Sequence, residues 1–305
     1  MPRHRTAMER STRTQGTGTE RGRAQGTAPC PFAVDDRTIA GHTQDIRLRL
    51  YRPLIGLAVP ALLYLHGGGF TSGSLEEAEE TASAIAAETP ALVVSVGYSL
   101  APAHPFPTAA QDAYRAALWT AGEARSLRLA RGGLGVVGYD AGGHVATSLT
   151  FLARDLGGVS LAAQALLGPM LDPSLTRASR SGIGDTDGKA ATTARLFDST
   201  MADCARCYRA YLPEAAQRLH PYAAPLESRR LGGLPPALIV TAQNDMLRTE
   251  AEQYAAGLIA AGVPTEVTRF PAISHDALPG HKPALQAVSD FLRRRLPRSL
   301  PAARA

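Results

Sequence analysis

Residues 136–146 read "VVGYDAGGHVA" and have the outline of a strand that runs into a tight turn and then a helix. Gly138, Gly142 and Gly143 stand where a sharp elbow needs residues without side chains, because glycine permits close approach and unusual backbone angles. Asp140 occupies the centre of this elbow. The stretch therefore predicts a β-strand followed directly by an α-helix, with a carboxylate at the junction.

Apolar runs of the same kind recur along the chain. Four such runs end in small or polar residues, which is typical of strands in a parallel sheet that is buried on both faces. They cover residues 61–70, 91–100, 134–140 and 237–245. Residues 45–53 instead alternate apolar and polar side chains, which predicts a half-buried strand.

Helical patterns separate these strands. Ser74 and Glu77 form a capping box, which predicts a helix over about 75–88. Further helices are predicted over 108–122, 141–154, 249–262 and 282–296. This alternation indicates an α/β fold, a doubly wound and mostly parallel sheet with its active site at the carboxyl ends of the strands.

Two segments depart from the alternation. Residues 173–232 contain a polar loop and a helical stretch with Tyr208 and Tyr211, and we expect this insertion to cover the strand ends as a lid. Residues 1–28 are rich in arginine, threonine and glycine and poor in apolar residues, which predicts a disordered tail. Residues 29–305 are expected to form one domain.

Charge and cysteine content argue against several classes of function. The net charge is +5, but most of the excess lies in residues 1–28, so no basic face for nucleic acid is implied. No apolar run reaches the roughly 18 residues of a membrane span, and the tail lacks the apolar core of a secretory signal. Cys204 and Cys207 have no further ligands nearby, so we expect no metal site and no cofactor. We expect a soluble, cytoplasmic protein.

Four motifs accompany the elbow: "HGGGF" (66–70), "GYSLAPAHPFPTAAQDAY" (97–114), "NDMLRTE" (244–250) and "ISHDAL" (273–278). In order and spacing they resemble the hormone-sensitive-lipase-like branch of the α/β-hydrolases, from about Phe32 to Leu296. The resemblance implies an α/β-hydrolase fold with an eight-stranded, mostly parallel sheet flanked by helices, a lid insertion, and a serine–acid–histidine triad. The matching triad positions are Asp140 for the nucleophile, Asp245 for the acid and His275 for the base.

The glycine-rich motif predicts an oxyanion hole. It allows the amides of Gly68 and Gly69 to point at one spot, and the amide of Ala141 adds a third donor; such fixed donors stabilise a developing oxyanion. The chain also departs from the family. Asp140 replaces the serine, and Tyr139 stands where members often have an acidic residue. Many members have Asp, Arg and Glu in a buried ionic brace near the site. Here those positions hold Gly97, Ser99 and Ala103, so we expect the brace to be missing.

Asp140 changes the chemistry that the site can perform. An aspartate has a pKa near 3.9 and is already ionised at neutral pH, and a helix N-terminus stabilises it as an anion. Attack on an ordinary ester would form an anhydride that readily reverts, whereas attack on a strained alkyl carbon forms a stable ester. Water activated by His275, oriented by Asp245, then hydrolyses that ester.

This is the logic of the epoxide hydrolases and haloalkane dehalogenases, whose elbow G-x-D-x-G resembles "GYDAG". The only tryptophan, Trp119, lies away from the motifs, which disfavours halide binding and favours an epoxide. Tyr208, Tyr211 and Tyr222 are the candidate acids that protonate the opening ring. The arginine-rich composition suggests a GC-rich genome and a natural-product pathway.

Three alternatives remain open. They are an esterase with a substituted nucleophile, a dehydratase or cyclase on the same framework, and a binding protein, which the retained His275 and Asp245 disfavour. An aspartate introduced to trap a substrate complex is a further explanation of Asp140. The expected partner is a small hydrophobic substrate rather than a membrane or nucleic acid, and a homodimer is one assembly that we consider.

Overall fold

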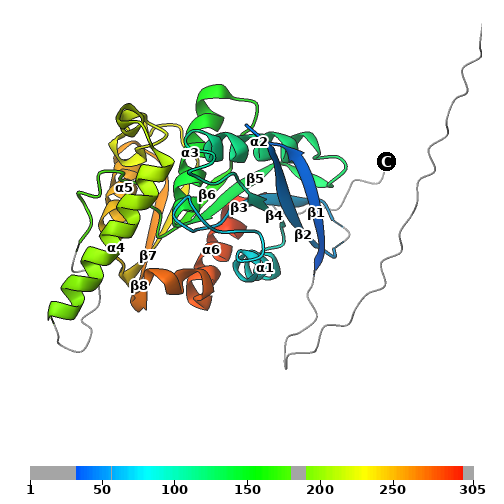
Figure 1. Ribbon diagram of the computed structural model, residues 1–305. Helices are drawn as coiled ribbons and strands as arrows, with labels where there is room; N and C mark the ends of the chain where they lie inside the picture. Colours follow the sequence, from blue (N-terminus) through cyan, green and yellow to red (C-terminus); the bar gives the residue numbers. More distant parts are fainter. Residues whose placement is uncertain (1–31, 56, 180–189, 298–305) are drawn as a thin grey trace, which may run out of the picture. The chain divides into compact units, whose positions relative to one another are not determined.

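The computed structural model describes residues 32–55, 57–179 and 190–297, the side chains of 190–194 excepted. The tail predicted for residues 1–28 and most of the polar loop after residue 179 lie outside them. The described chain is built on an eight-stranded sheet with the order β1-β2-β4-β3-β5-β6-β7-β8. β2 is antiparallel to both of its neighbours, and all the other pairs are parallel (Figure 1).

Two central strands, Val59–Leu65 and Ala163–Leu167, are buried along their whole length, as expected for a sheet covered on both faces. The strands are β1 Phe32–Ala40, β2 Asp45–Pro53, β3 Val59–Leu65, β4 Leu92–Gly97, β5 Leu129–Tyr139, β6 Ala163–Leu167, β7 Ala237–Asn244 and β8 Thr265–Ser274. Alternate side chains of β3 enter two separate cores: Leu63 and Leu65 face one, and Leu62 and Tyr64 face the other. The sheet therefore lies between two apolar layers.

Helices cover each face of the sheet. The helices are α1 Glu79–Glu88, α2 Thr108–Gly122, α3 Ala141–Leu156, α4 Ala190–Tyr211, α5 Arg248–Ala260 and α6 Lys282–Arg295. Apolar side chains of α2, α3 and α5 belong to one core, whereas those of α1 and α6 belong to the other. In Figure 1, α2 and α3 accordingly lie on one side of the sheet and α1 and α6 on the opposite side.

The α/β-hydrolase fold predicted from the resemblance is confirmed. The elbow falls where expected, since β5 ends at Tyr139 and α3 begins at Ala141. The amide of Glu77 donates to the Ser74 hydroxyl at 3.1 Å, but this bond lies in the turns before α1, which begins only at Glu79 and whose N-cap, Ala78, makes no side-chain capping bond. The edge strands β1 and β8 had no prediction of their own.

The segment between β6 and β7 carries the large helix α4 and two short 3-10 helices, Ala215–Leu219 and Pro225–Glu227. α4 lies beside the β7–β8 end of the sheet in Figure 1. Tyr211, the last residue of α4, stacks on Phe70 of the glycine-rich loop with ring centroids 4.1 Å apart. This stacking ties α4 to the loop that follows β3. None of the described helices is long and apolar enough to cross a membrane.

Candidate active site

Asp140 sits at a strained elbow. Its backbone angles are φ 53° and ψ −121°, a region that costs a non-glycine residue of order 1–3 kcal/mol. The turn is possible because glycine follows: a Cβ on Gly142 would collide with the carbonyl oxygens of Leu65 and His66. The amide of Asp140 donates to Leu167 of β6 at 3.0 Å. The elbow is therefore fixed against two neighbouring strands.

The Asp140 carboxylate occupies the predicted oxyanion hole. The amides of Gly68 and Gly69 each donate to its Oδ2 atom at 2.9 Å. The amide of Ala141 also interacts with this carboxyl group. Two of the three predicted donors thus bind Oδ2 of Asp140, and Oδ1 is the oxygen directed at the imidazole.

Asp245 and His275 complete a hydrogen-bonded chain. Asp245 follows β7, and its Oδ2 lies 2.8 Å from Nδ1 of His275, which follows β8. Nε2 of the same imidazole lies 3.5 Å from Oδ1 of Asp140. Asp245 is buried, and its other oxygen accepts the amide of Leu247 at 2.8 Å. The structure thus brings together all three residues predicted for the triad.

Electrostatics favour an ion pair between Asp140 and His275. Burial acts to raise the pKa of Asp140, but the hydrogen bond and charge of His275 and the amides of Ala141 and Gly69 outweigh it, so the pKa lies below its ordinary value. Burial acts to lower the pKa of His275, but Asp245 and Asp140 outweigh it and hold the pKa well above its ordinary value. Both shifts favour a carboxylate on Asp140 and an imidazolium on His275.

A cavity of about 700 Å³ opens over these residues. Its floor holds the glycine-rich loop, Asp140 and His275, and Met170, Met246 and Leu247 add apolar surface. One stripe of α4 forms another part of the wall, with the residues Leu196, Thr200, Asp203, Cys204 and Cys207. The cavity can thus hold a small, mostly apolar molecule above the reactive groups.

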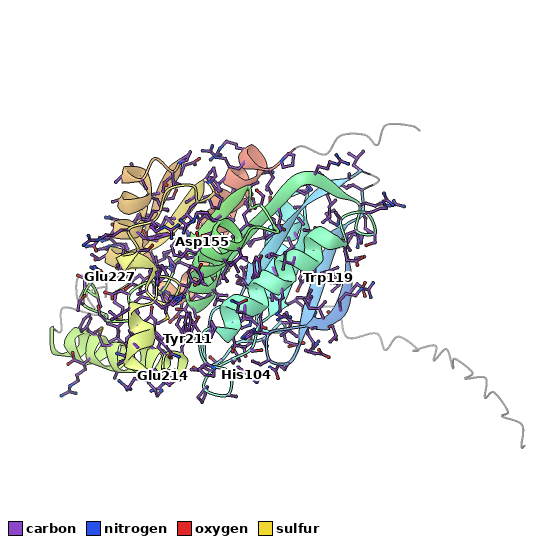
Figure 2. The ribbon with its side chains drawn as sticks, turned by 90° about the horizontal axis from the view of Figure 1, so that it is seen from above. His104, Trp119, Asp155, Tyr211, Glu214 and Glu227 are labelled. Atoms are coloured by element: carbon purple, nitrogen blue, oxygen red, sulfur yellow. The ribbon has the colours of Figure 1, made fainter. Side chains whose placement is uncertain are left out.

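The tyrosines predicted as ring-opening acids do not line this cavity. Tyr208 and Tyr211 are buried in the apolar core, where burial holds the pKa of each phenol above its ordinary value. Tyr222 donates to Oδ2 of Asp155 at 2.9 Å. Figure 2 labels Tyr211 at the end of α4, and Asp155 and Trp119 on α3 and α2. This structure thus does not bring the three predicted tyrosines to the cavity, because the tyrosines of α4 face the core.

Residues that sequence reasoning did not assign to the site also reach the cavity. Tyr139 lines it beside His275, and both cysteines of the C-x-x-C motif line it from α4. Both thiols are free, and the described residues contain no cluster that could hold a metal ion. The i, i+3 spacing of Cys204 and Cys207 indicated one helix face, but only the packing of α4 shows that this face lines the cavity.

The loop after β4 is held by uncharged groups and one carboxylate. Asp112 of α2 accepts the amide of Ser99 at 2.9 Å and the amide of His42 at 2.6 Å. Gln44 donates to the Ser99 hydroxyl at 3.1 Å. Gly97, Ser99 and Ala103 cannot form the ionic brace of the resemblance, and these hydrogen bonds hold the loop instead.

Comparison with known proteins agrees with this geometry. Residues 62–278 match the sequence family described as the alpha/beta hydrolase fold. The chain belongs to this family. Carboxylesterase NlhH of Mycobacterium tuberculosis is 35% identical over 250 residues, which cover 79% of this chain and 74% of the relative. Ethyl acetate hydrolase of Pseudomonas putida is 34% identical over 260 residues, which cover 82% of this chain and 77% of that protein.

Solved structures give the same result. The thermostable carboxylesterase EstE1, cloned from a metagenomic library, superposes with a TM-score of 0.77 at 32% identity, covering 89% of this chain and 92% of its own. These comparisons support a hydrolase with carboxylesterase relatives. They add no support to the epoxide interpretation or to the natural-product setting.

Proposed function

We propose that the protein hydrolyses carboxylic esters of small, largely apolar molecules and that Asp140 is the nucleophile. The observation that carries this proposal is the position of the Asp140 carboxylate, with Oδ2 bound to the amides of Gly68 and Gly69 and Oδ1 3.5 Å from Nε2 of His275. The esterase relatives support the substrate class. The hydrogen-bonded Asp140 carboxylate supports a route through a covalent bond to Asp140.

In the first step Oδ1 of Asp140 attacks the acyl carbon of the ester. The bond to the alcohol oxygen breaks, and that oxygen takes the proton from Nε2 of the His275 imidazolium. The product is a mixed anhydride on Asp140. Protonation of the leaving alcohol opposes the reversal that an anhydride otherwise undergoes, because a neutral alcohol is a weak nucleophile. Esters with good leaving groups, such as aryl esters, are the favoured substrates.

In the second step neutral His275 takes a proton from water, and the water oxygen attacks Cγ of Asp140. Negative charge then develops on Oδ2, which already lies at 2.9 Å from two amide donors. Such preorganised donors stabilise an oxyanion by about 2.7–4 kcal/mol each when measured by deletion. The bond between Cγ and Oδ1 breaks, the product acid departs with Oδ1, and Asp140 loses its remaining proton to solvent.

The charges around the cavity favour an uncharged substrate. Asp203 and Asp276 line it in addition to Asp140 and Asp245, and among the described lining residues only His275 is basic. An ester that carries its own carboxylate would meet like charges here, and like charges within a few ångströms repel. A neutral ester meets mainly the methionine and leucine side chains of the wall.

Epoxide opening is the second candidate, because the same position of Oδ2 suits the hydrolysis of an alkyl ester on Asp140. The His275 imidazolium would then protonate the opening ring in place of the lid tyrosines predicted from the sequence. This route differs from ester hydrolysis only in the first bond that Asp140 forms. A panel of aryl esters and styrene-type epoxides, assayed with the same preparation, distinguishes the two.

The decisive experiment is a single turnover in ¹⁸O-water with enzyme in excess over an aryl ester. Attack on Cγ places ¹⁸O in the Asp140 carboxylate, which peptide mass spectrometry detects, while the first product acid keeps ordinary oxygen. Label in the product acid alone would show that water attacks the acyl carbon, either of the substrate or of the anhydride, and would overturn hydrolysis at Cγ of Asp140. Turnover of epoxides alone would overturn the ester substrate.

A further inference from the structure

Tyr139 contacts both halves of the site. Its ring centroid lies 5.1 Å from that of His275, with the ring planes at 33°. Its hydroxyl donates to the backbone carbonyl of His275 at 3.4 Å. On the other side, a Cβ on Gly67 would lie 2.6 Å from Cδ1 of the tyrosine, so the ring packs directly on the backbone that precedes the oxyanion-hole amides.

The phenol itself is a poor proton donor. Burial, together with the nearby carboxylates of Asp140, Asp276 and Asp245, holds the pKa of Tyr139 far above its ordinary value. The hydroxyl is also directed at the backbone carbonyl of His275. The ring rather than an ionisable oxygen is therefore the part of this residue that bears on the site.

We propose that Tyr139 is a positioning residue that acts as a spacer between the glycine-rich loop and the His275 imidazole and so sets the distance between His275 and Asp140. The inference rests on the proposed function for the roles of these two residues. It explains why a bulky aromatic side chain can stand next to the nucleophile: the chain before the hole has glycine at position 67, which leaves room for the ring.

Removal of the ring would let the loop that carries His275 shift. A shift on the order of 1 Å can cost about a hundredfold in rate when reacting groups are involved. The α4 stripe and the apolar wall line the cavity away from this contact, so we expect kcat to fall and KM to change little. The imidazolium would also move away from Asp140 and lose part of the interaction that stabilises its charge.

The test compares Tyr139→Phe, which keeps the ring, with Tyr139→Leu and Tyr139→Ala, which remove it. We expect Tyr139→Phe to retain kcat within about threefold and the leucine and alanine variants to lose about tenfold to a hundredfold. The second readout is the titration of the His275 ring by NMR, assigned with His275→Gln. Its midpoint should stay in place in Tyr139→Phe and fall toward about 6.5 in the other variants.

If the alanine variant does not fold, Tyr139→Leu alone is compared with Tyr139→Phe. Gly67→Ala tests the same contact from the glycine-rich loop, because the added Cβ pushes on the ring. An unchanged His275 titration in a folded Tyr139→Leu protein would overturn the spacer role. Equal losses in Tyr139→Phe and Tyr139→Leu would assign the effect to the hydroxyl instead and also overturn it. The NMR titration needs no substrate, so these outcomes are separate from a failure of the ¹⁸O experiment.

Discussion

Nε2 of His275 lies 3.5 Å from Oδ1 of Asp140, a contact that raises the pKa of the imidazole and lowers the pKa of the carboxyl group. In a serine hydrolase the corresponding contact joins a neutral imidazole to a hydroxyl, and the imidazole begins as a base. In the mechanism that we propose, the carboxylate needs no base, and the imidazole begins with a proton to give. In that mechanism the substitution at the elbow reverses the order in which His275 acts as acid and base.

The first prediction concerns pH. Because the pKa of His275 is raised, its charge contributes to the stability of the fold. This contribution is fully present below the unfolded pKa of about 6.5 and is lost as pH rises through the raised folded pKa. The low pKa of Asp140 has the opposite effect, so its contribution is lost as pH falls through that value. We expect kcat to decline on the alkaline side and Asp140→Asn to lower the His275 titration midpoint in NMR. An unchanged midpoint in Asp140→Asn would show that the pair is not ionic.

The second prediction concerns the nucleophile. Asp140→Ser restores a hydroxyl while it leaves Gly68, Gly69 and the His275–Asp245 pair in place. His275 then has a proton to remove, and general-base catalysis contributes about 10²–10⁴-fold. We expect hydrolysis of short aryl esters at least about a hundredfold above that of Asp140→Ala. A folded serine variant that is no faster than the alanine control would show that the hole or the base is misplaced for acyl transfer.

The sequence predicted which residues meet in the site but not how each one contributes. The glycines around Asp140 and the motifs shared with the resembling family were sufficient to place Asp140, Asp245 and His275 together. The position of Oδ2 in the hole depends on a side-chain rotamer, which no spacing of residues specifies. The resemblance therefore led to the triad positions, whereas the ion pair became apparent only from the distances.

The lid tyrosines show where the pattern was insufficient. On α4 the cavity wall follows a helical stripe from Leu196 through Thr200 to Cys207. Tyr208 and Tyr211 lie on the adjacent stripe and pack with Phe70. Both stripes are partly apolar, so composition alone does not tell which one faces the sheet. Tyr139 was missed for a different reason, since its role depends on two loops that are distant in the sequence.

The third prediction concerns the oxyanion hole. A Cβ on Gly69 would lie 2.6 Å from Sγ of Cys207, at a backbone φ of 58°. Gly69→Ala should therefore displace the loop and cost up to about a hundredfold in kcat, near the value of one lost oxyanion donor. Cys207→Ala alone should stay close to the parent, and Gly69→Ala with Cys207→Ala should recover part of the loss because the added methyl group then has space. The double-mutant cycle measures this coupling, and strictly additive losses would show that a clash with Cys207 does not cause the loss in Gly69→Ala.

The last prediction concerns substrate charge. Asp276 lines the cavity next to His275 and is exposed, so its charge acts on a substrate through a screened interaction of about 1 kcal/mol or less. Asp276→Asn should raise kcat/KM about two- to fivefold for an aryl ester with a carboxylate on its acyl chain. The matched neutral ester should change little. Salt should reduce the difference between the two esters in the parent, because the Debye length shortens to about 3 Å at 1 M.

The control is Asp290→Asn, which removes a carboxylate of α6 that does not line this cavity and is paired with Arg293. Equal effects of the two substitutions would show that net charge, and not the charge at the cavity, governs the choice of ester.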